Sequence, residues 1–193
     1  MVDVTRATGS AVVLTNAHVI KNATRITVTV RDQEIYTAQI LGVDDLRDLA
    51  VLKICCSSQF SAIALAASDT TRLGEQIVVL GYPLGFTTLR VSVGIISGKQ
   101  YDSSLDRYEF QTDAALNPGN SGGPMLRLDG TLAGIVTYGI KSTGTVADVE
   151  GIGFGIAADT IAANVSRLAA GTIVSAPTPT PHPAAPAGRY TNP

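Results

Sequence analysis

A glycine-rich stretch at residues 119–124 (GNSGGP) carries the residue types that acyl transfer needs. A serine flanked by glycines on a tight turn can expose its hydroxyl group while neighbouring backbone N–H groups stay free. Ser121 is therefore the candidate nucleophile, and the N–H groups of Gly119 and Ser121 are the candidate oxyanion hole, where each donor contributes about 3 kcal/mol. Glycine, asparagine and serine are also common in ordinary turns, so this stretch alone does not separate a catalytic turn from a plain one.

A serine hydroxyl is a weak nucleophile until a base within hydrogen-bond reach takes its proton. The chain contains two histidines. His182 lies in a proline-rich stretch that gives it nothing to pack against, whereas His18 directly follows the apolar segment 11–15. An isolated histidine is more often structural than catalytic, but His18 is the one candidate for the general base.

The base needs an acceptor for its second ring nitrogen, which fixes the tautomer and stabilises the imidazolium. An acidic cluster at residues 44–48 (DDLRD) offers three carboxylates. Asp48 is preferred because the apolar residues 49–52 follow it at once, which places it at the mouth of a buried strand. Asp44 and Asp45 are expected to be solvated loop residues.

Most of the chain is composed of short segments rich in Val, Ile, Thr or aromatic residues and bounded by Gly, Asp, Asn or Pro, a pattern that predicts strands. Many short strands without long helical periods between them predict a barrel or sandwich rather than a parallel α/β sheet. One helix is predicted near the end of the chain, with Asp159 as its cap and Ile161, Val165 and Leu168 on one face. The predicted strands cover residues 11–15, 25–31, 34–41, 49–54, 77–80, 89–97, 108–112, 132–138 and 152–156.

Three blocks resemble the triad blocks of HtrA/Deg-type serine proteases: residues 15–19 (TNAHV), 48–53 (DLAVLK) and 111–124 (QTDAALNPGNSGGP). Their order of His, Asp and Ser is the order of chymotrypsin-like enzymes. The resemblance implies a catalytic triad of His18, Asp48 and Ser121 and ATP-independent cleavage of unfolded or misfolded polypeptides outside the cytoplasm. It implies no metal and no cofactor, and it leaves a homo-oligomer open as the assembly state.

The fold class that follows is all-β, a chymotrypsin-like double β-barrel with a short C-terminal helix. We expect an N-terminal barrel over residues 1–62 that carries the histidine and aspartate, a C-terminal barrel with the helix over residues 63–174 that carries the serine, and a proline-rich disordered tail or linker over residues 175–193. Four clear strands precede Cys55 where six are expected, so an abbreviated first barrel is one interpretation and a shortened hairpin another. No PDZ-like module is recognisable after the tail.

The resemblance also indicates the S1 pocket, which receives the residue before the scissile bond. Trypsin-type specificity needs a carboxylate at the base of this pocket, but the residue six before the serine is Ala115, followed by Leu116. Ile152, Gly153 and Phe154 are the other expected substrate-binding residues. We therefore predict an apolar pocket that prefers Val, Ala or Leu before the scissile bond.

The resemblance also implies two mobile loops, residues 100–108 and 139–151, that become ordered on activation.

The net charge and the distribution of apolar residues argue against nucleic acid as a partner and against a membrane span. A net charge of −2 with scattered cationic side chains gives no patch that could bind nucleic acid. The sequence contains no run of about eighteen apolar residues, so no membrane span is predicted. The first six residues lack the pattern of a secretory signal, so an extracytoplasmic location is expected from the resemblance alone. Cys55 and Cys56 are neighbours, and a disulfide between them is not expected because it would be strained.

Two other functions remain to be weighed. A catalytically impaired protease fold that binds exposed apolar segments is favoured by the short N-terminus, although all three triad side chains are retained. A lipase or esterase fits poorly, because the serine lacks a strand-to-helix elbow and the histidine comes first in the chain.

Overall fold

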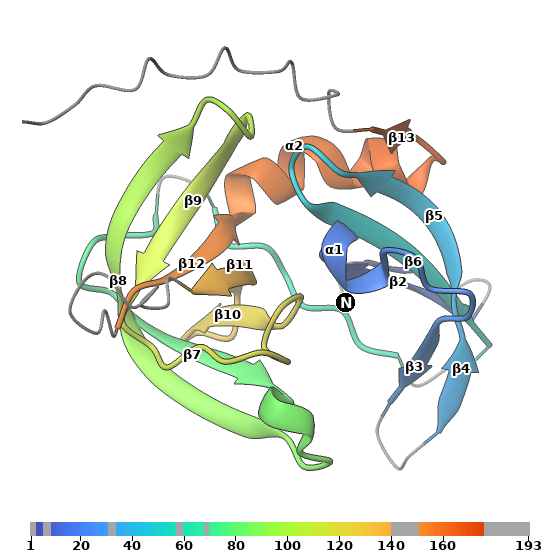
Figure 1. The fold of residues 1–193 in the computed structure, drawn as a ribbon, viewed down its shortest axis with the longest axis horizontal. Helices are drawn as coiled ribbons and strands as arrows, with labels where there is room; N and C mark the ends of the chain where they lie inside the picture. Colours follow the sequence, from blue (N-terminus) through green and yellow to red (C-terminus); the bar gives the residue numbers. More distant parts are fainter. Residues whose placement is uncertain are drawn as a thin grey trace, which may run out of the picture.

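The computed structural model of the protein describes residues 3–5, 9–30, 34–56, 60–67, 70–139 and 151–175. Two β-structures lie side by side, with the helix α2 (Ala158–Ala169) across one end of both (Figure 1). The prediction of an all-β architecture with a short C-terminal helix is confirmed, and in the described residues one of the two β-structures is a closed barrel and the other an open sheet. The N-terminal strands are β1 (Asp3–Thr5), β2 (Ser10–Thr15), β3 (Thr27–Thr29), β4 (Ile35–Thr37), β5 (Gln39–Asp44) and β6 (Leu49–Cys55).

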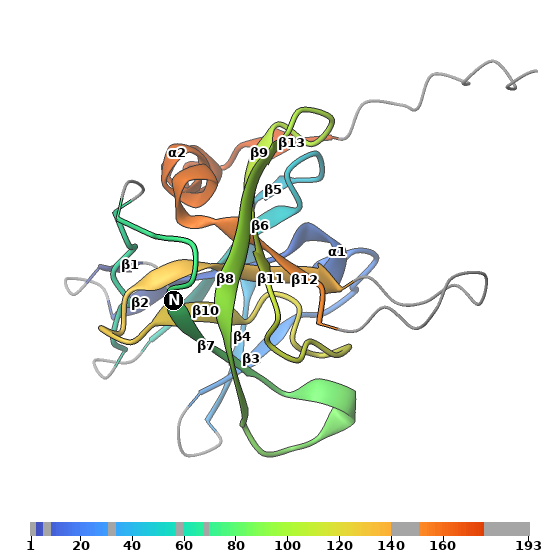
Figure 2. The ribbon, with the colours of Figure 1, turned by 90° about the vertical axis from the view of Figure 1, so that its left-hand side faces the viewer.

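The C-terminal half is a closed antiparallel barrel. Its order is β10-β11-β12-β9-β8-β7, and β8 runs the full height of the barrel (Figure 2). Its interior is filled by fully buried side chains that alternate along the strands, among them Ile77, Ile96, Phe110 and Met125. The strands are β7 (Gln76–Gly81), β8 (Arg90–Asp102), β9 (Arg107–Thr112), β10 (Pro124–Arg127), β11 (Leu132–Gly139) and β12 (Gly153–Ala157), and a single 3₁₀ turn, η2 (Pro83–Gly85), follows β7.

The N-terminal half is more open. Within the described residues it consists of one sheet in the order β1-β2-β6-β5-β13 and a separate β3-β4 hairpin, so no closed ring is formed. β13 (Ile173–Val174) comes from the other end of the chain and pairs in parallel with β5. The count of four strands before Cys55 was too low, because β1 was missed and the segment 34–41 is divided into β4 and β5.

The helix α2 joins the two halves. Ile161 and Leu168 are fully buried and pack with Leu14 and Val51 of the N-terminal sheet and Ile135 of the barrel. Because one apolar cluster includes both β-structures, the relative placement of the elements that carry the candidate triad depends on it. The helix begins after Ala157, so the prediction that Asp159 caps it was wrong, and Asp159 lies in the first turn.

Leu168→Ala should test this role of the helix. The substitution leaves a cavity at the junction of both β-structures, and we expect the free energy of unfolding to fall by about 2–5 kcal/mol. Urea unfolding followed by circular dichroism measures the change. Ser166→Ala, on the exposed face of the same helix, is the matched control and should stay within about 0.5 kcal/mol of wild type; an equal loss in both variants would contradict the assignment.

Several other sequence-based expectations are corrected or lie outside the described residues. Residues 100–108 are not a loop, because β8 and β9 extend into a hairpin whose turn is residues 103–106. The second predicted loop falls almost entirely in residues 140–150, and the proline-rich tail in residues 176–193, both outside the described part. Cys55 and Cys56 are both exposed and are joined by a disulfide across a cis peptide bond, contrary to expectation.

Two further points concern the division of the chain and the membrane. The predicted boundary between residues 62 and 63 stays a prediction; β13, at the end of the second predicted unit, adds a strand to the sheet of the first. Among the residues that the structure describes, no helix combines the length and apolar character that crossing a membrane requires.

Candidate active site

His18 lies on α1 (Ala17–Ile20), a single turn that follows β2 and that the sequence did not predict. Its ring atom Nδ1 lies 2.8 Å from Oδ2 and 3.0 Å from Oδ1 of Asp48, and its backbone N–H donates to Oδ1 at 2.9 Å. The His18 side chain is 47 % exposed and that of Asp48 18 %. A carboxylate in this position keeps the ring proton on Nδ1, which leaves Nε2 able to accept a proton.

Asp48 ends the turn between β5 and β6. Besides His18, its carboxylate accepts a hydrogen bond from Oγ1 of Thr137 at 2.8 Å. Thr137 belongs to β11, so the closed barrel takes part in holding a carboxylate that the other half supplies. Thr137 was missed by sequence reasoning, because no local pattern distinguishes it from the other threonines in strands.

Asp44, in the same acidic cluster, is fully buried, so the expectation that it is a solvated loop residue was wrong. Its carboxylate accepts hydrogen bonds from the backbone N–H and the guanidinium of Arg47 and from the guanidinium of Arg167 on α2. Two arginines compensate the burial of this charge. Asp45 is exposed, as expected.

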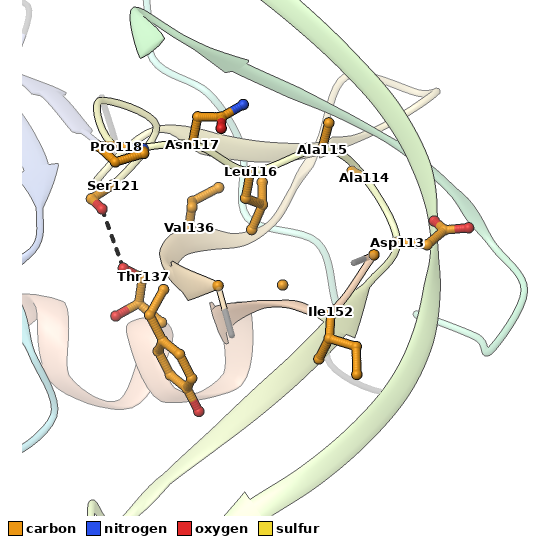
Figure 3. A pocket seen from close by; sticks show the side chains of 14 residues that line it. Asp113, Ala114, Ala115, Leu116, Asn117, Pro118, Ser121, Val136, Thr137 and Ile152 are labelled. Carbon is orange, nitrogen blue, oxygen red and sulfur yellow. Dashed lines mark hydrogen bonds between the residues drawn. The ribbon is translucent and has the colours of Figure 1, made fainter. Parts of the chain in front are cut away.

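Ser121 lies on the tight turn before β10. Its hydroxyl donates to the backbone carbonyl of Thr137 at 3.2 Å, and within the described residues no hydrogen bond joins it to His18 (Figure 3). Thr137 therefore contacts the candidate nucleophile through its carbonyl and Asp48 through its hydroxyl. Thr137 thus links Ser121 to Asp48, and Asp48 in turn contacts His18.

The backbone of the serine turn leaves two N–H groups unused. Gly119 has a φ of 101°, and a β-carbon there would lie 2.4 Å from the carbonyl oxygen of Tyr82, so the position demands glycine. Among the described residues, the N–H groups of Gly119 and Ser121 donate no hydrogen bond, whereas those of Asn120, Gly122 and Gly123 donate to Asn117, Val136 and Asn120. The free donors are the two that the sequence proposed as an oxyanion hole.

A pocket of about 940 Å³ opens beside Ser121. Four of the expected substrate-binding residues line it: Ala115, Leu116, Ile152 and Gly153 (Figure 3). A β-carbon on Gly153 would lie 2.3 Å from Cδ1 of Leu116, so the glycine makes room for the leucine.

Phe154, the fifth expected substrate-binding residue, does not line the pocket. It is buried behind Tyr138, with ring centroids 4.9 Å apart. Tyr138 itself forms part of the pocket wall.

The Tyr138 hydroxyl is held by the carboxylate of Glu109. Burial and then the neighbouring carboxylate of Glu109, to which the hydroxyl donates at 3.2 Å, raise the pKa of Tyr138 to about 12. A phenol with so high a pKa stays protonated at neutral pH and remains a hydrogen-bond donor.

Within the described ranges, no group of three or more His, Cys, Asp and Glu side chains could hold a metal ion. The groups at this site that can take part in acyl transfer are Ser121, the His18–Asp48 pair and the free N–H groups of Gly119 and Ser121.

Comparison with known proteins shows the family of the chain. The model of the trypsin-like peptidase domain matches residues 4–135. The putative serine protease HhoA of Synechocystis sp. is 40% identical over 183 residues, which are 90% of this chain and 43% of HhoA. Serine protease Do-like HtrA of Bacillus subtilis is 40% identical over 156 residues, which are 77% of this chain and 34% of that protein.

A solved structure gives the same answer for the fold. The HtrA-type protease AlgW with a decapeptide superposes with a TM-score of 0.75 at 36% identity, covering 86% of this chain and 50% of the other. The chain spans less than half the length of the curated relatives named above. It belongs to the trypsin-like peptidase family and, within that family, to the HtrA-type serine proteases.

Proposed function

We propose that the protein is a serine endopeptidase that hydrolyses polypeptides through an acyl-enzyme. The observation that carries this proposal is the contact of His18 Nδ1 with the Asp48 carboxylate at 2.8 Å, next to the turn that carries Ser121. A histidine held in this way can accept the serine proton on Nε2. Family membership supports the same reaction class.

The proposed reaction proceeds in two halves. His18 takes the proton of Ser121, whose oxygen attacks the peptide carbonyl, and the N–H groups of Gly119 and Ser121 stabilise the oxyanion. His18 then protonates the leaving amine, and water repeats the sequence on the acyl-enzyme. Asp48 stays ionised throughout, and a rotation about χ1 of Ser121 is needed first, since its hydroxyl donates to Thr137 in the free protein.

For the substrate, we propose unfolded or misfolded polypeptides outside the cytoplasm. Relatives from Chlamydia muridarum and Rickettsia prowazekii are named probable periplasmic serine endoproteases. A chain that enters an active site must be locally extended, and unfolded proteins meet that demand without a prior opening step. The alternative of an impaired module that only binds apolar segments has less support, because the relatives carry protease names.

The proposed preference at S1 is for small or medium aliphatic residues. Leu116, Val136 and Ile152 give the pocket apolar walls, and Ala115 stands where a trypsin-type carboxylate would be needed. Asp113 is the one carboxylate among the described lining residues. It accepts a hydrogen bond from the backbone N–H of Ile95 at 2.7 Å and lies at the end of the pocket away from Ser121 (Figure 3). Among the described residues that line the pocket, a cationic side chain would find no counter-ion near the nucleophile, and its burial would be costly.

The test is a cleavage-site profile. The protein is incubated with a reduced and alkylated polypeptide and with the same polypeptide in its native, disulfide-intact form, and products are sequenced by mass spectrometry. We expect cuts in the unfolded form only, with Val, Ala or Leu before most scissile bonds and none in the Ser121→Ala variant. Preferential cutting after Arg or Lys would overturn the S1 assignment, and equal cutting of the native form would overturn the substrate class.

A further inference from the structure

The backbone of Asp48 is held in an unusual conformation. Its φ is 59°, in the left-handed region that costs a non-glycine residue about 1–2 kcal/mol. Such a residue persists where its surroundings hold it. The two carbonyl groups that flank its α-carbon are both engaged by side chains: the Asp48 carbonyl accepts from Nδ2 of Asn16 at 3.0 Å, and the Arg47 carbonyl accepts from Nη1 of Arg107 at 2.9 Å.

Arg107 reaches the Arg47 carbonyl from the other half of the molecule, since it lies on β9 of the closed barrel. It is 3 % exposed, and its Nε and Nη2 donate to Oε1 of Glu109 at 2.9 and 2.6 Å. Glu109 is fully buried on the same strand, and its Oε2 accepts from Gln100 and from the Tyr138 hydroxyl. The ion pair thus fixes the guanidinium so that its remaining nitrogen points at the Asp48 turn.

The hairpin of β8 and β9, which carries Arg107, also binds the side chain of Arg47. Its Nε donates to the Asp106 carbonyl at 3.0 Å, and its Nη2 pairs with the Asp106 carboxylate. The hydrogen bond from the Tyr101 hydroxyl and then the charge of Arg47 lower the pKa of Asp106, so this partner stays ionised at neutral pH. The turn that carries Asp48 is therefore attached to the β8–β9 hairpin through both its backbone and a side chain.

A buried ion pair is weak evidence for a role in stability, because its desolvation offsets much of its attraction and apolar replacements are often neutral. This pair is distinguished by a third hydrogen bond, which Arg107 donates to the Arg47 carbonyl in the peptide bond before Asp48. We propose that Arg107, held by Glu109, is a positioning residue for the reaction: it fixes the backbone of the Asp48 turn, so that the carboxylate is aimed at Nδ1 of His18. This proposal rests on the proposed function.

The test removes both charges at once, so that no unpaired charge is left buried. The double variant Arg107→Met/Glu109→Leu is compared with wild type for urea unfolding, for the rate at which a fluorophosphonate probe labels Ser121, and for the downfield proton NMR signal of His18 Nδ1–H. We expect unfolding close to wild type, labelling at least about tenfold slower because small misplacements cost up to about 10²-fold in rate, and a broadened proton signal.

The matched control is Arg127→Met/Glu75→Leu, which removes another Arg–Glu pair of the same barrel. In the described part of the chain, Arg127 and Glu75 make no contact with the Asp48 turn, and this variant should label at the wild-type rate. A folded double variant at positions 107 and 109 that also labels at that rate, with a sharp His18 signal, would overturn the proposal.

Two outcomes need a separate readout. If the wild type itself never labels, the proposed function fails, and the positioning role of Arg107 is then judged from the His18 proton signal alone. A signal that stays sharp in the double variant would contradict this role, and a signal that is lost would support it. If the double variant does not fold, Arg107→Lys replaces it, because one ammonium keeps the charge beside Glu109 but cannot also reach the Arg47 carbonyl in the same geometry. Wild-type labelling by Arg107→Lys would overturn the proposal.

Discussion

Ser121→Ala is expected to reduce kcat for peptide cleavage by about 10⁶-fold while leaving the fold intact. Among the described residues, the hydroxyl makes a single hydrogen bond, to the Thr137 carbonyl, so its loss changes little in the free protein. The flanking residues on the turn are glycine and asparagine, so the turn itself offers no replacement nucleophile. What remains is the small contribution of the oxyanion donors and of substrate binding.

Cleavage of an unfolded polypeptide followed by fluorescence measures this effect, with a thermal unfolding curve to establish that the variant folds. Ser104→Ala, in the turn between β8 and β9, is a matched control that removes a hydroxyl of the same kind and should retain wild-type cleavage. Residual cleavage by Ser121→Ala above about one thousandth of the wild-type rate would mean that another residue acts as the nucleophile.

Asp48→Asn should lower kcat by about 10⁴-fold. The backbone N–H of His18 donates to Oδ1, so the oxygen of asparagine is expected to keep that position. Its NH2 group then takes the position of Oδ2, 2.8 Å from His18 Nδ1. An N–H group there favours the tautomer that carries its proton on Nε2, which cannot accept the proton of Ser121. The loss is therefore chemical, and KM should change much less than kcat.

Asp45→Asn is the matched control, since it makes the same change of charge on the same turn at an exposed position. We expect its kcat within about twofold of wild type at moderate ionic strength, where exposed charges are screened. Steady-state kinetics on one peptide substrate measures both variants. Equal losses in the two would show that the negative charge of the turn, and not the contact with His18, matters.

The parts of the site that could be predicted from sequence are those that local chemistry dictates. The glycine at position 119 is required by a positive φ and a close backbone approach, so the amino-acid sequence alone indicates a tight turn around the serine. The burial of the strand after Asp48 followed from residues 49–52, which are all buried. The alternation of apolar residues similarly located most strands of both halves.

The parts that escaped prediction depend on contacts between the two halves. Thr137 is relevant only because β11 passes beside Asp48, and Asp44 is buried because Arg47 and Arg167 surround it. Arg107 likewise has the sequence pattern of an ordinary polar residue in a strand, and only the fold brings its guanidinium to the Arg47 carbonyl. Periodicity within one element carries no information on partners about 60–120 residues away along the chain.

The short helix α1 was not predicted from the sequence for a different reason. It has four residues, no side-chain cap and no acidic residue in its first turn, so none of the usual start signals is present. The apolar run 11–15 in front of it was correctly predicted as a strand, and His18 was therefore expected at a strand end. Its orientation toward Asp48 comes from the helical turn, which also presents its backbone N–H to the carboxylate.

The most direct test of the central claim is labelling by a fluorophosphonate probe, which reacts with a serine that is activated by its base. Wild type, Ser121→Ala and His18→Ala are treated at equal concentration after thermal unfolding curves establish that all three fold. The account predicts that wild type labels on Ser121, that Ser121→Ala does not label, and that His18→Ala labels at most very slowly. A folded wild type that never labels, or a His18→Ala variant that labels as fast as wild type, would contradict the assignment of His18, Asp48 and Ser121 as one catalytic unit.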